Sequence, residues 1–348
     1  MKTLKKLSIL LVSILITVMV TGCADKNSST TSTNPTSKTQ LALGTVCTIT
    51  LYDNSDVEVI DKAFARLTEL ENILSINKTG TELDEVNNMA GISPVKVSND
   101  TMQVVVKGLE YSKLSNGSLD ITIGPLVKLW GIGTESARLP SEAEIDKKKA
   151  LIDYNLVEVD ETKNTIFLKN SDMIIDLGAI AKGYAADEVV KLLKDNGVSS
   201  AIIDLGGNIF ALGKKQDGSP WKVGVQNPEK SGSDTIGFVT TSDKSIVTSG
   251  VYERYFEFEE KSYHHILNPE TGYPYEKGIL GVSIVSDTSI DGDSLSTTLF
   301  ALGVDDGLKL IESLDHVDAI FITRDHNLYL SSGFKDIFTL TNDDFKIK

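Results

Sequence analysis

The sequence predicts an α+β domain whose strands form mixed, largely antiparallel sheets with flanking helices. The composition is that of a globular protein, with 41 % hydrophobic and 24 % charged residues among 348. Stretches with apolar residues at helical spacing lie between stretches with the alternation of strands. The strands come in runs and do not alternate one by one with helices, which favours α+β over a doubly wound parallel sheet.

The first half of the chain contains the clearest helix patterns. Residues 43–52 alternate as a strand. A helix is expected next, because apolar residues recur at helical spacing at Val57, Ile60, Phe64, Leu67 and Leu74. A second helix is expected over residues 99–114, and residues 141–144 fit a capping box that opens a short helix. Residues 157–168 read as a hairpin.

The second half alternates shorter elements. Residues 173–177 are apolar and predict a strand, and a helix is expected over 183–194. Another strand is expected over 201–205, before a Gly-Gly turn. Two more helices are expected over 294–302 and 308–314.

The N-terminus has the pattern of an export signal. Three lysines precede an apolar run over residues 7–20, which is too short to span a bilayer, since a span needs about 20 apolar residues. Val20-Thr21-Gly22-Cys23 resembles a bacterial lipobox. We therefore expect a signal peptide over 1–22, a lipidated Cys23 with a flexible Ser/Thr-rich tether over 23–40, and the folded domain over 41–348. This places the chain on the outer face of the cell membrane; plain secretion and an uncleaved anchor are the alternatives.

Charge and cysteine content exclude several protein classes. The formal net charge of −15 opposes binding to nucleic acid or anionic lipid, so the lipid anchor is the expected membrane contact. Two cysteines cannot build a cysteine-rich zinc site. If Cys23 is lipidated, Cys47 stays an unpaired thiol on a strand.

Two clusters suggest chemistry with phosphate and a cation. Asp293 and Thr297 are four residues apart at a predicted helix start, so both oxygens would face one side and suit Mg²⁺. An N-cap followed by an ordinary threonine is the alternative. Asp176 to Tyr184 runs from a strand into a helix, where N–H groups and Lys182 could receive a phosphate. A structural strand-to-helix turn explains this stretch equally well.

Two further clusters suggest a polar ligand and a base. Thr248-Ser249-Gly250 permits close approach to a ligand, although an ordinary loop has the same composition. His264 and His265 precede a Pro-Glu-Thr-Gly turn and would point to opposite faces of a strand. At most one should face a site, as a general base; a surface hairpin is the alternative.

Taken in order, these clusters resemble the ApbE family, the FAD:protein FMN transferases. The resemblance runs from Leu43 to Gly303, most of the mature chain. It is carried by Leu43-Gly44-Thr45, Ser75 to Asn87, Asn116 to Thr122, Gly124 to Gly131, Asp176 to Asp187, Asp204 to Asn208, Thr248 to Arg254, His265 to Gly272, and Asp293 with Thr297.

The resemblance implies an ApbE- or T-fold-like domain and a Mg²⁺-dependent transfer. FAD is cleaved, FMN is attached to a Thr or Ser of an exported acceptor flavoprotein, and AMP is released. By position, Asp293, Thr297 and the Ala179 carbonyl would bind the metal, and His265, Asp293 and Lys182 would be catalytic. The residues expected to bind FAD are Leu43, Asn77, Ser118, Leu119, Asp120, Asp176, Lys182, Thr248, Ser249 and Ile266.

Three departures from the family pattern stand out. Asn268 replaces the usual Asp of the histidine motif, and Leu43 replaces Met. Asn77 stands where many members carry an aromatic ring, and without that ring water could reach the diphosphate. This raises the alternative of an FAD pyrophosphatase that releases FMN and AMP. A non-catalytic FAD-binding lipoprotein is a third hypothesis, which Lys182 and the Asp293/Thr297 pair oppose.

Overall fold

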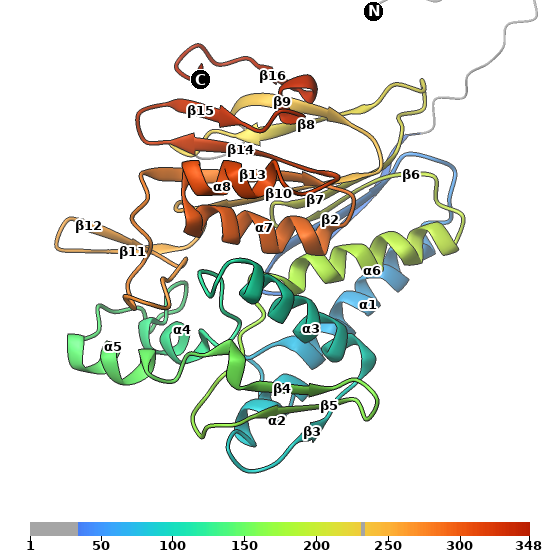
Figure 1. Ribbon diagram of the computed structural model, residues 1–348. Coiled ribbons are helices and arrows are strands. Elements are labelled where there is room, and N and C mark those ends of the chain that lie inside the picture. Colours follow the sequence, from blue (N-terminus) through green and yellow to red (C-terminus); the bar gives the residue numbers. More distant parts are fainter. Residues whose placement is uncertain (1–33, 231–233) are drawn as a thin grey trace, which may run out of the picture. The chain divides into compact units, whose positions relative to one another are not determined.

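A nine-stranded sheet forms the centre of the computed structural model, which describes residues 34–230 and 234–348 (Figure 1). Its strands, in spatial order, are β1 (Thr36–Ala42), β2 (Thr45–Leu51), β6 (Ser200–Leu205), β7 (Asn208–Gly213), β10 (Lys244–Gly250), β13 (Ile279–Ser286), β14 (Val317–Thr323), β15 (Asn327–Leu330) and β17 (Lys346–Ile347). Every neighbouring pair is antiparallel except β15 and β17. The predicted α+β class with largely antiparallel sheets is confirmed.

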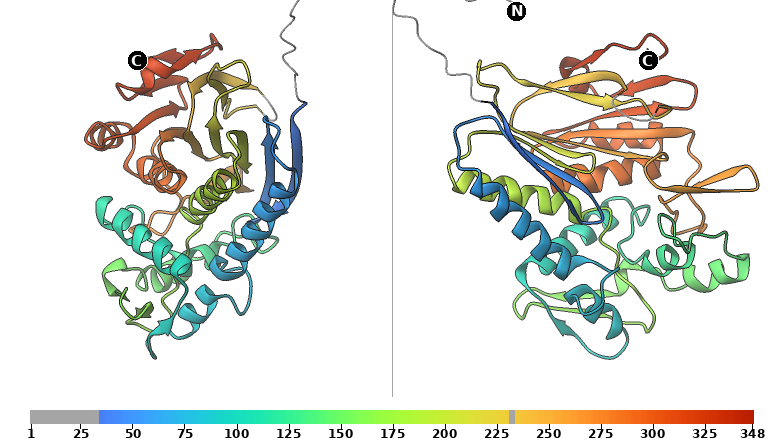
Figure 2. Two further views of the ribbon diagram at one scale, coloured as in Figure 1. Left: turned by 90° about the vertical axis from the view of Figure 1, so that its right-hand side faces the viewer. Right: turned by 180° about the vertical axis from the view of Figure 1, so that it is seen from behind.

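Helices pack beneath this sheet in the view of Figure 1. They are α1 (Glu58–Leu74), α3 (Asn99–Leu114), α6 (Ala181–Asp195), α7 (Ser289–Leu302) and α8 (Val304–Ile311). Helices α1, α3 and α6 each bury one apolar stripe in a shared core, whereas α7 is buried on most sides. Leu67 of α1, Val189 of α6 and Leu299 of α7 have no exposed surface. Helices α6 and α7 lie side by side, as the views of Figures 1 and 2 agree.

A second layer of strands covers the other face of the sheet. Strands β8 (Trp221–Gln226), β9 (Thr235–Thr241) and β16 (Phe338–Leu340) form a three-stranded sheet, with α9 (Phe334–Ile337) leading into β16. Their apolar side chains pack on those of the central sheet, including Val285 and Ile320. Because both faces of β13 are covered, all eight of its residues are buried.

The remaining elements lie beyond α6 and α7, away from the central sheet (Figure 1). They are α2 (Glu82–Asn88), α4 (Gly124–Trp130), α5 (Glu142–Lys149), the 3₁₀ turn η1 (Tyr154–Leu156), and the sheet of β3 (Val95–Lys96), β5 (Thr165–Leu168) and β4 (Val157–Asp160). A hairpin of β11 (Tyr255–Phe258) and β12 (Lys261–His264) projects beside α4. Trp130 anchors this region, because its indole is buried against Phe256 and Tyr263.

Local sequence signals predicted several elements closely. Helices α1 and α3 match their expected ranges, and the capping box at Ser141 and Glu144 is present at α5. The hairpin over residues 157–168 forms as β4 and β5, and α6 begins two residues before its expected start. In each case the residues that specify the element are close neighbours in sequence.

The predicted tether is too long at its C-terminal end. Residues 36–40 belong to β1, which pairs with β2 along its whole length. The hydroxyls of Ser37 and Thr39 lie 2.9 Å from those of Thr50 and Thr48 across the pair. An exposed edge strand lacks the apolar alternation that marks a half-buried one, so composition alone suggested a flexible segment.

The strand predicted over residues 173–177 is extended but forms only a single bridge, between Ile174 and Ile123. Its backbone donors go elsewhere, since Ile175 N–H binds the Asn87 side chain (2.7 Å) and Asp176 N–H binds the Ile121 carbonyl (2.8 Å). The segment is buried like a strand and its apolar pattern reflects that burial.

Helices α7 and α8 begin earlier than predicted. Helix α7 starts at Ser289, so Asp293 lies in its second turn and not at its start. Helix α8 spans Val304–Ile311, four residues ahead of the expected range at its start. The start of α7 has no side-chain cap from its own N-cap residue, because a carboxylate of another helix accepts its first N–H groups.

The predicted signal peptide, the lipobox and Cys23 lie outside the described residues. Within residues 34–230 and 234–348, no helix is long and apolar enough to cross a membrane.

Arg66 ties α1 to α3 and α6. Its guanidinium lies 2.5 Å from Asp100 and 2.7 Å from Glu188, and its side chain is only 18 % exposed. The Tyr184 hydroxyl donates to the same Asp100 oxygen (2.5 Å). The arrangement holds two carboxylates from different helices around one cation.

We predict that Arg66→Ala lowers the free energy of unfolding by about 2 kcal/mol, because it leaves two partly buried carboxylates without their cation. Urea unfolding measures the change. Arg138→Ala is the control, since Arg138 pairs with Glu144 at an exposed position and should cost less than about 1 kcal/mol. Equal losses in the two variants would contradict the prediction.

Candidate active site

The N-terminus of α6 presents polar groups at the end of the extended 173–177 segment. Asp176 is half-buried and accepts the Gly178 N–H (2.7 Å), which shapes the turn into the helix. Desolvation raises the pKa of this carboxyl, against the opposing effect of the Gly178 hydrogen bond. The Ala179 carbonyl accepts no hydrogen bond from the described residues, and Lys182 follows in the first turn. A carbonyl without a donor suits a cation ligand.

Asp293 of α7 reaches this helix terminus directly. Its carboxylate is buried, with one oxygen accepting the Gly183 N–H (2.9 Å) and the other lying 3.2 Å from Lys182 Nζ. The helix N-terminus and the ammonium group both stabilise negative charge there. Two residues predicted to be catalytic, Lys182 and Asp293, are therefore in contact, although 111 positions separate them in sequence.

The end of β10 places the hydroxyl group of Ser249 against α7. Ser249 Oγ lies 2.7 Å from Ser296 Oγ and 3.4 Å from Thr297 Oγ1. Thr297 is one turn beyond Asp293, on the same side of α7. Thr248 instead pairs with the neighbouring strand, its hydroxyl 2.7 Å from Ser283 Oγ. The structure thus brings Ser249 to the predicted metal ligands and leaves Thr248 one residue away within the sheet.

The predicted donor set consists only of oxygen atoms. Asp293 supplies the carboxylate, Thr297 a hydroxyl and Ala179 a carbonyl, and each carboxylate oxygen retains acceptor capacity beside its present donor. Such a set fits Mg²⁺, which prefers oxygen ligands and keeps several waters or phosphate oxygens. No group of three or more His, Cys, Asp or Glu side chains that could hold a metal occurs in the described parts of the chain.

His265 follows β12 and faces the carbonyl of Arg254. Both its backbone N–H (3.1 Å) and its Nδ1 (3.2 Å) lie within hydrogen-bond distance of that oxygen. Because a carbonyl can only accept, Nδ1 carries the proton and the lone pair is on Nε2. Desolvation, with the positive charge of Arg254, lowers the pKa of His265 to about 3, so the ring is neutral at physiological pH. His264 is buried against Phe300, and its Nε2 donates to the Tyr275 carbonyl (2.9 Å) while its Nδ1 accepts the Ile266 N–H (3.3 Å).

Glu253 was not among the site residues predicted from the sequence. Glu253 is exposed to solvent, although partial desolvation of its carboxyl raises its pKa to about 7. Lys182 and Arg254 oppose the rise, and Asp293 adds to it, so the carboxyl senses the charges of the site. The available signal was the adjacent Glu-Arg pair after Thr-Ser-Gly, which local patterns do not distinguish from a charged loop.

Tyr275 joins two segments that were predicted to contact FAD. Its hydroxyl donates to the Ser118 carbonyl (2.9 Å), and its backbone N–H donates to the Ile266 carbonyl (3.0 Å). A cavity of about 300 Å³ opens here, lined among others by Ser118, Asn268 and Lys277. The residues that line this hollow do not include Lys182 or Asp293.

Other predicted residues have structural surroundings. Asp120 is buried, and its carboxylate accepts N–H groups of Thr122 (2.7 Å) and Tyr154 (3.1 Å). Leu119 is also buried, with its N–H bound to a serine hydroxyl. Leu43 is half-buried in the β1–β2 turn with a φ of 53°, and Asn77 is exposed on the turn after α1. The Cys47 thiol is buried, and desolvation raises its pKa to about 11, which makes it unreactive.

Comparisons with known proteins identify the relatives of this chain. The ApbE family model matches residues 43–321. Among curated relatives, the FAD:protein FMN transferase of Klebsiella pneumoniae is 37 % identical over 305 residues, covering 88 % of this chain and 94 % of its own. The enzyme of the same name from Treponema pallidum is 34 % identical, covering 86 % and 88 %.

Solved structures show the same fold. The ApbE protein of Thermotoga maritima superposes with a TM-score of 0.81 at 27 % identity, covering 87 % of this chain and 99 % of that one. The flavin transferase ApbE of Vibrio cholerae gives a TM-score of 0.78 at 26 % identity, covering 87 % and 99 %. With a family match over most of its length and relatives this similar, the chain belongs to the ApbE family.

Proposed function

We propose that this chain is an FAD:protein FMN transferase that uses Mg²⁺ and an exported acceptor protein. The contact of Lys182 with Asp293 at the N-terminus of α6 carries the proposal, because it combines a cation, a helix terminus and a hard-metal ligand at one point. The curated relatives with this name cover most of the chain. The alternative of FAD hydrolysis rests on the exposed Asn77, which provides no aromatic shield.

The proposed reaction replaces the phosphoanhydride bond of FAD with a phosphoester bond to the acceptor. The P–O bond of the FAD diphosphate breaks, AMP leaves with the bridging oxygen, and the acceptor hydroxyl oxygen bonds to the phosphorus of FMN. Lys182 and the helix N-terminus bind the diphosphate and offset the negative charge that develops on it. Asp293, Thr297 and the Ala179 carbonyl would hold Mg²⁺, which supplies charge neutralisation at the diphosphate.

A base must take the proton of the acceptor hydroxyl. His265 offers a neutral Nε2, and a bound diphosphate would strengthen it as a base by opposing the field of Lys182 and Arg254. Glu253 is the second candidate, because its pKa of about 7 suits proton transfer near neutral pH. We assign the base to His265 and a supporting electrostatic role to Glu253.

The tether and Cys23 would keep this site at the membrane surface. We propose that Cys23 is lipidated after removal of residues 1–22 and that the enzyme acts outside the cytoplasm on acceptors there. The lipobox-like Val20-Thr21-Gly22-Cys23 supports this. Loss of membrane association in Cys23→Ser would be expected, and an unchanged membrane fraction would count against the anchor.

The transfer is tested by incubating the protein with FAD and Mg²⁺, with and without a flavoprotein domain that presents a Thr or Ser. We expect covalent flavin fluorescence on the acceptor in a denaturing gel, together with AMP. Asp293→Asn should lower the rate by at least about 100-fold, because it removes the negative charge that faces both the metal and Lys182. FMN and AMP formed equally without acceptor would support hydrolysis instead, and full activity in Asp293→Asn would refute the assigned site.

The pH dependence of kcat/KM for FAD should show an acid limb at or below a pH of about 7, from Glu253. Its carboxyl is ionised above this pKa and protonated below it, so the rate should fall as the pH falls through that value. A metal beside Asp293 would shift the limb to lower pH. Glu253→Gln should remove the limb, and an identical profile in that variant would contradict the assignment.

A further inference from the structure

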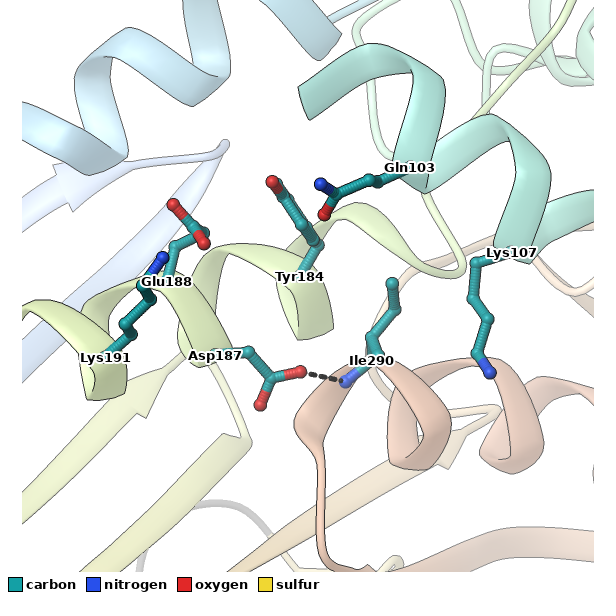
Figure 3. A pocket seen from close by; sticks show the side chains of 7 residues that line it. All are labelled: Gln103, Lys107, Tyr184, Asp187, Glu188, Lys191 and Ile290. Atoms are coloured by element: carbon teal, nitrogen blue, oxygen red, sulfur yellow. Dashed lines mark hydrogen bonds between the residues drawn. The ribbon is translucent and has the colours of Figure 1, made fainter. Parts of the chain in front are cut away.

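Helices α6 and α7 cap each other at their N-termini. Asp293, in the second turn of α7, accepts the N–H of Gly183 in the first turn of α6 (2.9 Å). Asp187, in the second turn of α6, accepts the N–H groups of Ser289 (2.7 Å) and Ile290 (2.9 Å) in the first turn of α7. Figure 3 shows the Asp187 carboxylate directed at Ile290. Each helix thus satisfies otherwise unpaired N–H donors of the other.

The two helices also approach unusually closely. A Cβ added to Gly183 would lie 2.4 Å from the Ser289 carbonyl oxygen and 2.8 Å from Asp293 Cβ. There is therefore no room at this crossing for any side chain, and a small displacement of α7 alters the Asp293 hydrogen bond. Asp293 lies one turn beyond the N–H groups of α7 that Asp187 accepts.

We propose that Asp187 is a positioning residue of the active site. Its two hydrogen bonds hold Ser289 and Ile290, and α7 transmits that placement to Asp293 and Thr297, so that the metal ligands face the Ala179 carbonyl and Lys182. The inference rests on the proposed function, because it assigns Asp187 to the same Mg²⁺ and diphosphate site. Partners beyond the direct ligands commonly change metal affinity by about 10- to 100-fold when they are replaced.

The start of α7 has a second attachment on the sheet side. Ser289 Oγ donates to Asn208 Oδ1 of β7, and Ser245 Oγ of β10 donates to Ser289 Oγ (2.9 Å). Removing Asp187 should therefore loosen the helix start on one side and leave the fold intact. The resulting movement of α7 should displace the Asp293 side chain, which faces α6.

The surroundings of Asp187 define suitable assay conditions. Desolvation raises its pKa to about 6, with contributions from Asp291 of α7 and Glu188 of α6. Asp187 lines a cavity of about 360 Å³ together with Lys107 of α3 and with Tyr184 and Lys191 of α6 (Figure 3). At a pH of about 8 the carboxylate is ionised, so its replacement by an amide changes its charge and its hydrogen bonds.

The test compares Asp187→Asn with Asp195→Asn in the full-length protein at that pH. Asp195 is an exposed residue at the other end of α6, so it controls for the same change on the same helix. The first readout is the Mg²⁺ concentration that gives half of the Mg²⁺-dependent rise in Tm with FAD bound. The second is the affinity for FAD in EDTA, measured by flavin fluorescence. Single-turnover flavin transfer is the third readout.

For Asp187→Asn we expect the half-maximal Mg²⁺ concentration to rise about tenfold, the FAD affinity in EDTA to change less than about twofold, and the transfer rate to fall at subsaturating Mg²⁺ and recover at high Mg²⁺. Asp195→Asn should match the unmodified protein. Asp187→Ser, judged by the same readouts, replaces Asp187→Asn if the latter does not fold.

A lower Tm with an unchanged Mg²⁺ requirement would show a merely structural role and overturn the inference. If the unmodified protein binds Mg²⁺ but transfers no flavin, the proposed function fails while the Mg²⁺ titration still decides the role of Asp187. A Tm of the unmodified protein that does not respond to Mg²⁺ would overturn the positioning role and the metal assignment together.

Discussion

The mutual capping of α6 and α7 is the interaction on which the rest of the site depends. A helix N-terminus has unpaired N–H groups and a partial positive charge, and here both ends are satisfied by carboxylates of the opposite helix. The pair is stable only if the helices stay in close contact, which Gly183 permits by having no side chain. The buried β13 supports α7 from the sheet, and Arg66 fixes α6 to α1 and α3. The central sheet and Arg66 therefore hold the two helices whose N-termini meet at the site.

This arrangement also explains how an acidic protein can bind a diphosphate. The net charge of −15 describes a surface that repels anions. At the site, Lys182, Arg254 and the N-terminus of α6 lie together, and a divalent cation on Asp293 would add further positive charge. Local geometry reverses the sign that the composition indicates. Desolvation raises the pKa of Glu253 and lowers the pKa of His265, and both groups sense the charges of Lys182 and Arg254.

Features encoded by near neighbours could be predicted from sequence, and features encoded across the fold could not. The capping box at Ser141 was predictable because its partner is three residues away. The start of α7 was not, because Asp187, which accepts its first N–H groups, is 102 residues earlier. For the same reason Asp293 was expected at a helix start and lies instead in the second turn. The site residues were predicted mainly from the family resemblance, which carries long-range information that periodicity lacks.

In the proposed site, Asp293, Thr297 and the Ala179 carbonyl bind one metal ion beside Lys182. The most direct test of this assignment is a crystal structure with FAD and Mn²⁺, in which anomalous scattering locates the metal. We expect a single Mn²⁺ bound to these three oxygens and to the diphosphate, with Lys182 contacting the same diphosphate. A metal bound elsewhere, or a diphosphate that does not contact Lys182, would contradict the assignment.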